Sequence, residues 1–260
     1  MHTEPVFLEM AGGEWLTGTY APGTARPEFA VLWVHGFGSH RGGEKAASVR
    51  AECARRGWAF AAFDFRGHGE SGGTMLDLRA SRLLEDLSAA REWLAGRGHS
   101  RLGLVGSSMG GFASAWFAKR NPECAVGCVL LAPAFGFLDR RWNNITPEEQ
   151  AVWRSTGKRR IESEWVSIEI GIGLVEERAE FAPHELVRDW RTPSLLFHGM
   201  VDAVVPDADS LYFARHADYP RIELRLLKDG DHRLTAYKDL IASATGAFFS
   251  ELLDGAAVRR

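Results

Sequence analysis

Ser108 stands between Gly106 and Gly110 in the sequence Gly-Ser-Ser-Met-Gly, so that a serine is centred in a Gly-x-Ser-x-Gly pattern. An apolar run at 102–105 precedes the pattern, and residues at helical spacing follow it at 112–120. A strand, this turn and a helix in that order strain the central serine and raise its hydroxyl above a sheet edge. The flanking glycines lack a Cβ, so neighbouring backbone can pass close by. The pattern predicts a nucleophile, although in a chain with 28 glycines a turn without chemistry is the alternative.

A histidine and a carboxylate that could activate this serine follow later strands. A serine hydroxyl is a poor nucleophile at neutral pH and needs a base, usually histidine, which a carboxylate orients and stabilises. His232 follows the last expected strand in a Gly-Asp-His turn, and Asp202 follows the expected strand before it. Functional groups gather at the carboxyl ends of the strands in an open parallel sheet. We therefore predict Ser108, Asp202 and His232 as the catalytic residues.

Other residues could take these roles. His232 could instead be a histidine of a surface loop. Asp207 and Asp209 stand at the start of an expected helix, where they would cap it or interact with its dipole, and Asp139 follows an earlier strand. Four further polar residues beside glycines at strand ends are interpreted as loop architecture: His35, Arg66, His68 and His198.

The tetrahedral intermediate of acyl transfer carries an oxyanion, which backbone N–H groups can stabilise without reorganising. For a serine on such a turn, one donor comes from the next residue and one from the loop after the third strand. These donors are the N–H groups of Met109 and Phe37. Met109 also begins the helix after Ser108, so the positive end of that helix would face the developing charge.

Strands and helices alternate over most of the chain. After an expected hairpin at 6–20, continuous apolar runs typical of buried parallel strands occur at 29–34, 59–63, 102–105, 126–131, 194–197 and 222–227. This alternation predicts an α/β fold with a mostly parallel sheet and helices on both faces. Residues 135–190 show no clear buried strand and are too many for a loop. We expect a core of residues 1–134 and 191–260, with a small helical cap inserted at 135–190.

The expected cap contains Trp142, Trp153 and Trp165, which could line an apolar substrate pocket or form the cap's own core. The run Lys158–Arg160 could attract acidic substrates, although such a run is more often a solvated face. Thr146 precedes Pro147 and is a plausible N-cap of a cap helix.

Composition narrows the class of protein. The chain has 260 residues, of which 45% are apolar and 25% charged, and its net charge of −3 gives no reason to expect a nucleic-acid partner. Its three cysteines lack metal-binding spacing and suit buried, reduced thiols. We see no secretory signal and no run of about 18 apolar residues that could span a membrane. We therefore expect a cytoplasmic protein that needs no metal or organic cofactor; its oligomeric state stays open.

Five segments together resemble the α/β-hydrolase superfamily over nearly the whole chain. They are His35–Gly38, Asp64–Ser71, Gly106–Gly111, His198–Pro206 and Asp231–His232. Within the superfamily, the chain is similar to acyl-thioesterases that also cleave acyl glucuronides, and to bacterial cinnamoyl (feruloyl) esterases. The cap departs from both, so the resemblance implies no particular substrate.

The resemblance implies an α/β-hydrolase fold and a serine esterase or thioesterase that acts on a small-molecule acyl ester or thioester. It assigns the triad to Ser108, Asp202 and His232 and the oxyanion donors to Phe37 and Met109. Other chemistries of the same triad remain alternatives, namely a peptidase, a C–C bond hydrolase, a cofactor-free haloperoxidase and an acyltransferase. A non-catalytic binding protein of the same fold is a further alternative.

Overall fold

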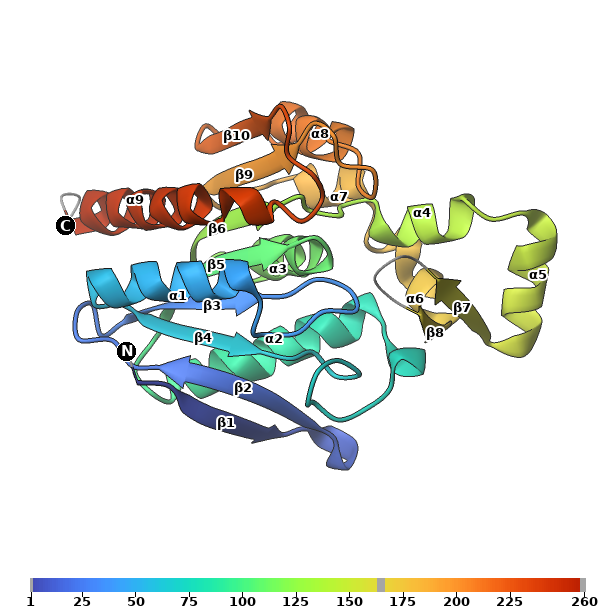
Figure 1. Ribbon diagram of the computed structural model, residues 1–260, viewed down its shortest axis with the longest axis horizontal. Helices are drawn as coiled ribbons and strands as arrows, with labels where there is room; N and C mark the ends of the chain where they lie inside the picture. The colour runs from blue at the N-terminus through green and yellow to red at the C-terminus, as the bar shows by residue number, and fades with distance from the viewer. Residues whose placement is uncertain (1, 163–166, 258–260) are drawn as a thin grey trace.

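The computed structural model describes residues 2–162 and 167–257, and its centre is an eight-stranded sheet (Figure 1). The strands lie in the order β1 (Glu4–Glu9), β2 (Trp15–Ala21), β4 (Ala59–Phe63), β3 (Phe29–Val34), β5 (Arg101–Ser107), β6 (Ala125–Leu131), β9 (Ser194–Gly199) and β10 (Ile222–Leu227). The strands from β4 to β10 run parallel, whereas β1 and β2 form an antiparallel hairpin at one edge. The predicted α/β fold and its N-terminal hairpin are confirmed.

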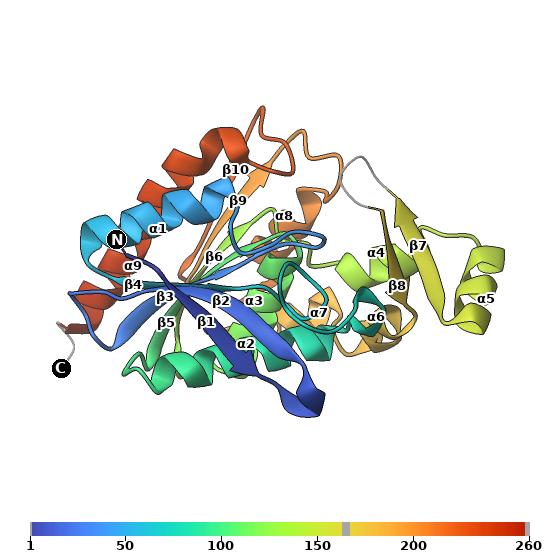
Figure 2. The same cartoon turned by 60° about the horizontal axis from the view of Figure 1, so that its bottom comes forward.

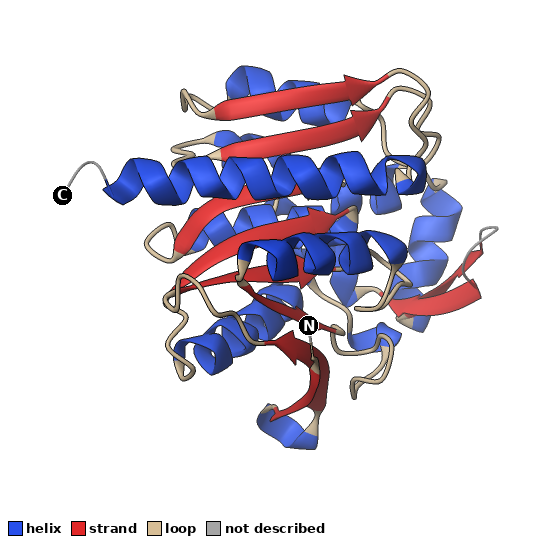
Figure 3. Cartoon of the chain, turned by 60° about the vertical axis from the view of Figure 1, so that its left-hand side comes forward, coloured by secondary structure: helices blue, strands red, loops and turns tan. Residues whose placement is uncertain are grey.

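Helices cover both faces of the sheet, which is why its central strands are apolar throughout. All residues of β3 and β4 are buried. One face carries α1 (Glu44–Arg56) and α9 (Lys238–Ala257), which lie across the front of the sheet in Figure 3. The other face carries α2 (Ala80–Ala95), α3 (Met109–Arg120) and α8 (Ala208–His216). Short 3-10 helices are η1 (Ala11–Gly13), η2 (Met75–Asp77) and η4 (Thr235–Tyr237).

The strand register brings the ends of the central strands into one row. Val34 of β3 is paired with Gly106 of β5, and Ser107 of β5 with Leu131 of β6. Leu131 is in turn paired with Phe197 of β9. The loops that follow these strands therefore begin side by side at the carboxyl edge, where the predicted site residues stand.

Residues 135–190, which we call the cap segment, project beyond the carboxyl ends of the strands (Figures 1 and 2). Their elements are α4 (Phe137–Asn143), α5 (Pro147–Thr156), β7 (Lys158–Glu162), β8 (Ser167–Gly171), α6 (Gly173–Glu176), η3 (Glu177–Ala179) and α7 (Pro183–Val187). Thr146 caps α5 through a reciprocal pair of bonds with Glu149, as expected. Besides its helices, the cap segment contains an antiparallel hairpin of β7 and β8, which the expected helical cap did not include. The hairpin has charged residues on its exposed positions and little apolar content, which hides its strand pattern.

The cap tryptophans that the structure describes are buried. Trp142 is 6% exposed and Trp153 is 1% exposed, and their rings lie 6.1 Å apart. The guanidinium of Arg154 lies 4.5 Å from the centre of the Trp142 ring, and that of Arg178 lies 5.1 Å from it. This packing favours the interpretation that both tryptophans form the cap's own core. Trp165 lies outside the described residues.

The basic run of the cap is neutralised locally. Each of its three side chains contacts a carboxylate: Lys158 pairs with Glu169, Arg159 with Glu149 and Arg160 with Glu162. Because these charges are already paired, the run offers little net attraction for an acidic substrate.

We predict that Trp153→Ala destabilises the protein by about 3 kcal/mol or more, because it leaves a cavity in the cap core. The matched control is Val152→Ala, since Val152 is the neighbouring residue and is 60% exposed. Thermal unfolding and acyl chain-length preference are measured on both variants. A shift in chain-length preference at unchanged melting temperature would instead place Trp153 in a substrate pocket.

Candidate active site

Ser108 lies at the junction of β5 and α3 in a conformation that L-residues rarely adopt. Its φ is 56° and its ψ is −116°. The surrounding backbone leaves room only for glycine: a Cβ on Gly110 would lie 2.1 Å from the Val34 carbonyl oxygen, and one on Gly106 would lie 2.3 Å from the Gly110 oxygen. The Ser108 N–H donates to the Leu131 carbonyl at 2.9 Å. The expected strained turn is therefore present.

His232 and Asp202 meet Ser108 at this turn. The Nε2 atom of His232 lies 3.0 Å from Ser108 Oγ, and its Nδ1 atom lies 2.7 Å from Asp202 Oδ2. A carboxylate can only accept, so Nδ1 carries the proton and Nε2 is free to accept from the serine hydroxyl. Two loops hold this pair together, because the Val201 N–H donates to the Gly230 carbonyl at 3.1 Å.

The Asp202 carboxylate is fully buried and accepts four hydrogen bonds. Its Oδ1 accepts from the N–H groups of Val204 and Val205, each at 2.8 Å. Its Oδ2 accepts from His232 and, at 3.3 Å, from Nε2 of His198. Burial raises the pKa of Asp202, but the bonds from His198, His232 and Val205 outweigh it and hold that pKa well below its usual range. The carboxylate is thus ionised and fixed in position.

His198 orients the acid, which is a role that the sequence did not reveal. Its Nε2 faces two groups that only accept, Asp202 Oδ2 and, at 3.0 Å, the Val205 carbonyl. This nitrogen therefore carries the proton, and Nδ1 accepts from the Ser210 hydroxyl at 2.7 Å. His198 thus has a structural role, as interpreted from the sequence. Its position only four residues before Asp202 was the signal that could have indicated its contact with the acid.

The rival acids lie elsewhere. Asp209 accepts hydrogen bonds from Arg140 at 2.8 Å and from the Gly136 N–H at 3.1 Å, so it joins α8 to the cap segment. Asp207 is the N-cap residue of α8, but its side chain makes no capping bond. Asp139 lies in the first turn of α4. None of these three is bonded to His232 in the described parts of the chain.

The loop after β3 brings the Phe37 N–H toward the nucleophile. A Cβ on Gly36 would lie 3.3 Å from Ser108 Cβ. His35 accepts at Nε2 from the Phe65 N–H (3.0 Å) and donates from Nδ1 to the Gly36 carbonyl (2.8 Å). Burial and the neighbouring His68 lower the pKa of His35 to about 3, which keeps the ring neutral. Since the two polar groups of a trans peptide point in opposite directions, this carbonyl bond aims the Phe37 N–H away from His35.

The second expected donor, the Met109 N–H, is the first of α3. Neither this N–H nor that of Phe37 donates to an acceptor among residues 2–162 and 167–257. Both are therefore free to donate to a ligand, and their role as oxyanion donors stays a prediction.

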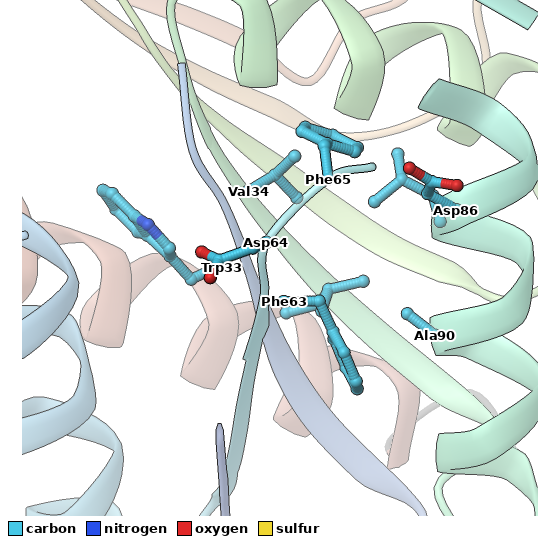
Figure 4. A pocket seen from close by; sticks show the side chains of 9 residues that line it. Trp33, Val34, Phe63, Asp64, Phe65, Asp86 and Ala90 are labelled. Carbon is cyan, nitrogen blue, oxygen red and sulfur yellow. The ribbon is translucent and has the colours of Figure 1, made fainter. Parts of the chain in front are cut away.

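Buried charges brace the loop after β4. Arg66 is bonded to three carboxylates, those of Glu14, Glu85 and Asp86. Asp64, Phe65 and Asp86 are among the residues that line a small cavity of about 10 Å³. In Figure 4 the side chains of Asp64 and Phe65 point in different directions from the end of β4. The interpretation of Arg66 as loop architecture agrees with these contacts.

Lys45 is a residue near the site that sequence reasoning left without a role. Its Nζ donates to Ser107 Oγ at 2.9 Å and to the Arg233 carbonyl at 2.5 Å. It thus joins the residue before Ser108 to the residue after His232. A lysine in the first turn of a helix opposes the helix dipole, and this unfavourable placement was the signal that could have singled it out.

Neither a metal-ligand cluster nor a membrane-spanning helix occurs in the part of the chain that the structure describes. It contains no cluster of three or more His, Cys, Asp or Glu residues that could hold a metal ion. It also has no helix long and apolar enough to cross a membrane. The three cysteines are buried free thiols.

Comparison with known proteins identifies the family. The model of the family described as "Serine aminopeptidase, S33" matches residues 25–168, which is over half of the chain. This chain belongs to that family. As a member of the serine aminopeptidase family, it is an α/β-hydrolase, in agreement with the sheet order and with the residues gathered at its carboxyl edge.

Two enzymes are similar to this chain in sequence. The mitochondrial palmitoyl-protein thioesterase of mouse is 26% identical over 213 residues, covering 81% of this chain and 71% of the relative. A monoacylglycerol lipase of Mycolicibacterium smegmatis is 27% identical, covering 79% of this chain and 69% of the lipase.

Two solved structures share the fold. A hydrolase from Agrobacterium vitis superimposes with a TM-score of 0.85 at 25% identity, covering 95% of this chain and 98% of that one. An esterase from Butyrivibrio proteoclasticus with bound ferulic acid gives 0.81 at 19% identity, covering 96% and 99%, and supports the fold alone.

We predict that Gly110→Ala destabilises the protein by about 2 kcal/mol or more, because the new methyl would collide with backbone that cannot move independently. Gly96→Ala is the control, since φ there is −61° and the added Cβ would make only ordinary contacts. Chemical denaturation compares the two variants, and equal stability would mean that α3 can move away from the end of β3 at low cost.

We predict a signed pH effect for Lys45→Met. Burial and nearby Arg233 lower the pKa of Lys45 from 10.5 to about 8 in the folded protein. Between these values the unfolded chain binds the proton and the folded chain does not, so the contribution of Lys45 to stability rises with pH. The difference in unfolding free energy between wild type and Lys45→Met should therefore increase above pH 8. A flat difference would show that Lys45 keeps an ordinary pKa.

Proposed function

We propose that this chain hydrolyses carboxylic esters or thioesters through a Ser108–His232–Asp202 triad and an acyl-enzyme intermediate. The observation that carries the proposal is the continuous line of bonds from Ser108 Oγ through both nitrogens of His232 to Asp202, at 3.0 and 2.7 Å. The chain is an enzyme of the carboxylesterase and thioesterase type, a class to which its thioesterase and lipase relatives belong.

In the first half-reaction, Ser108 Oγ attacks the acyl carbonyl while its proton passes to Nε2 of His232. The carbonyl oxygen becomes an oxyanion that accepts from the N–H groups of Phe37 and Met109. As the intermediate collapses, the bond to the alcohol or thiol breaks, and that leaving group takes the proton from Nε2. In the second half-reaction, water gives a proton to Nε2 and its oxygen attacks the acyl-enzyme, so that the acid leaves and Ser108 Oγ recovers the proton.

Two electrostatic features support these steps. The buried Asp202 carboxylate faces Nδ1 and stabilises the imidazolium that forms on His232. The N-terminus of α3 places its partial positive charge at the oxyanion, with Met109 as the first residue of the helix. Loss of one oxyanion donor typically lowers kcat by about 100- to 1000-fold.

The cap segment is proposed to restrict access to Ser108, because it projects from the edge at which the triad stands (Figure 2). Residues 1–134 and 191–260 would then form the catalytic core. A cytoplasmic location remains a proposal, and the mouse relative named above is mitochondrial.

We predict that Ser108→Ala lowers ester turnover to below about one ten-thousandth of wild type, because no other hydroxyl can form the acyl-enzyme. Turnover is measured on para-nitrophenyl esters from acetate to palmitate, together with acyl-CoA and methyl ferulate. Labelling by a fluorophosphonate is measured in parallel. The matched control is Ser107→Ala, which removes the neighbouring hydroxyl but leaves the nucleophile.

The outcomes separate the competing functions. Labelling of wild type and Ser107→Ala, but not of Ser108→Ala, together with ester turnover supports the proposal. Labelling without turnover of any ester or thioester would contradict the substrate class and would favour a peptidase or a C–C bond hydrolase. Labelling of folded Ser108→Ala would overturn the assignment of the nucleophile.

A further inference from the structure

Arg141 places a positive charge over the side chain of Phe37, a residue whose N–H is a proposed oxyanion donor. It lies in α4 of the cap segment, and its guanidinium carbon is 4.4 Å from the centre of the Phe37 ring and 5.2 Å from that of Phe137. The Phe37 and Phe137 rings contact each other at 5.9 Å, and Phe137 also contacts Phe112 of α3 at 6.2 Å. Arg141 therefore lies over an aromatic cluster that is built partly from Phe37, the residue whose N–H is a proposed oxyanion donor.

The neighbouring arginines have anionic partners, but Arg141 does not. Arg140 is paired with Asp209 at 2.8 Å, and Arg159 with Glu149 at 3.1 Å. Within residues 2–162 and 167–257, Arg141 makes no ion pair or hydrogen bond, and its contacts are with aromatic rings. Burial, Arg159 and Arg140 lower its pKa to about 10, so the side chain keeps its charge at neutral pH.

A half-buried guanidinium without an ionic partner lowers the stability of a folded protein. Removing it partly from water costs free energy that aromatic faces compensate only in part. The charged groups that shift its pKa, Arg159 and Arg140, are cations, and no carboxylate of the described residues forms an ion pair with it. A carboxylate would match the planar fork of the guanidinium with two parallel hydrogen bonds.

We infer that Arg141 is a specificity-determining residue that binds a carboxylate of the substrate. The substrates of the proposed reaction would thus be esters or thioesters that carry a carboxylate close to the scissile acyl group, on the acyl side or on the leaving group. This inference rests on the proposed function, since it places the carboxylate relative to Ser108 through Phe37.

Two pairs of isosteric esters test the inference. On the acyl side, the para-nitrophenyl monoester of glutaric acid is compared with the corresponding glutaramide ester. On the leaving-group side, carboxyphenyl butyrate is compared with carbamoylphenyl butyrate. Within each pair only the charge changes, so the ratio of the two kcat/KM values isolates the preference for the anion and shows which side carries it.

Wild type should prefer the carboxylate in one of the pairs by about tenfold or more, as for a charge-assisted bidentate bond. Arg141→Met should abolish this preference, mainly by lowering kcat/KM for the anionic ester, and Arg141→Lys should restore part of it. The matched control is Arg154→Met, which removes one positive charge from a cap arginine that also stacks on an aromatic ring but is exposed. That control should keep the wild-type preference.

Three results would overturn the inference while the proposed function stands. One is ester turnover by wild type without preference for the carboxylate in either pair. Another is an equal loss of preference in Arg141→Met and Arg154→Met, which would reveal a long-range effect of net charge. The third is an unchanged ratio in Arg141→Met with slower turnover of both esters, which would reveal a packing role. Failure of Ser108 labelling and of all turnover would instead reject the proposed function and the inference with it.

Discussion

The close passage of α3 beneath the end of β3 is the constraint on which the site depends. Gly110 lies so near the Val34 carbonyl that a Cβ would come within 2.1 Å of it. This contact forces the chain to turn from β5 into α3 at a single residue, and Ser108 absorbs the turn with a positive φ. The same contact brings the loop after β3 beside the nucleophile. The strain at Ser108 is stored where the chemistry needs an exposed hydroxyl and is offset by burial throughout α3.

Much of this arrangement could be predicted from the sequence because it depends on local patterns. Apolar runs revealed the parallel strands, and the residues just beyond them revealed the ends that meet at one edge. Ser108, Asp202 and His232 each follow such a run, and the structure brings them within hydrogen-bonding distance. These signals are strong because a strand that is buried on both faces must consist almost entirely of apolar residues.

The features that escaped prediction depend on contacts between distant segments. Lys45 joins the end of β5 to the loop after β10, two segments that are far apart in the sequence, and no local pattern predicts such a bond. The β7–β8 hairpin is mostly polar and adds only a few isoleucines to the core, so its apolar pattern is weak. The lack of an ionic partner for Arg141 among the described residues could not be inferred either. It depends on the ion pairs that the neighbouring arginines form with Asp209 and Glu149.

The first turn of α8 contacts both the cap segment and the surroundings of Asp202. Asp209 binds Arg140 and the backbone of the cap segment, and the next residue, Ser210, bonds His198 behind the Asp202 carboxylate. The cap segment and the acid of the triad are thus fastened to adjacent residues of one rigid helix. A displacement of α4 that keeps its link to Asp209 must tilt this helix end, and so it reaches the hydrogen bonds that orient the catalytic acid. The position of α4 and the orientation of Asp202 are therefore coupled through two adjacent residues at the start of α8.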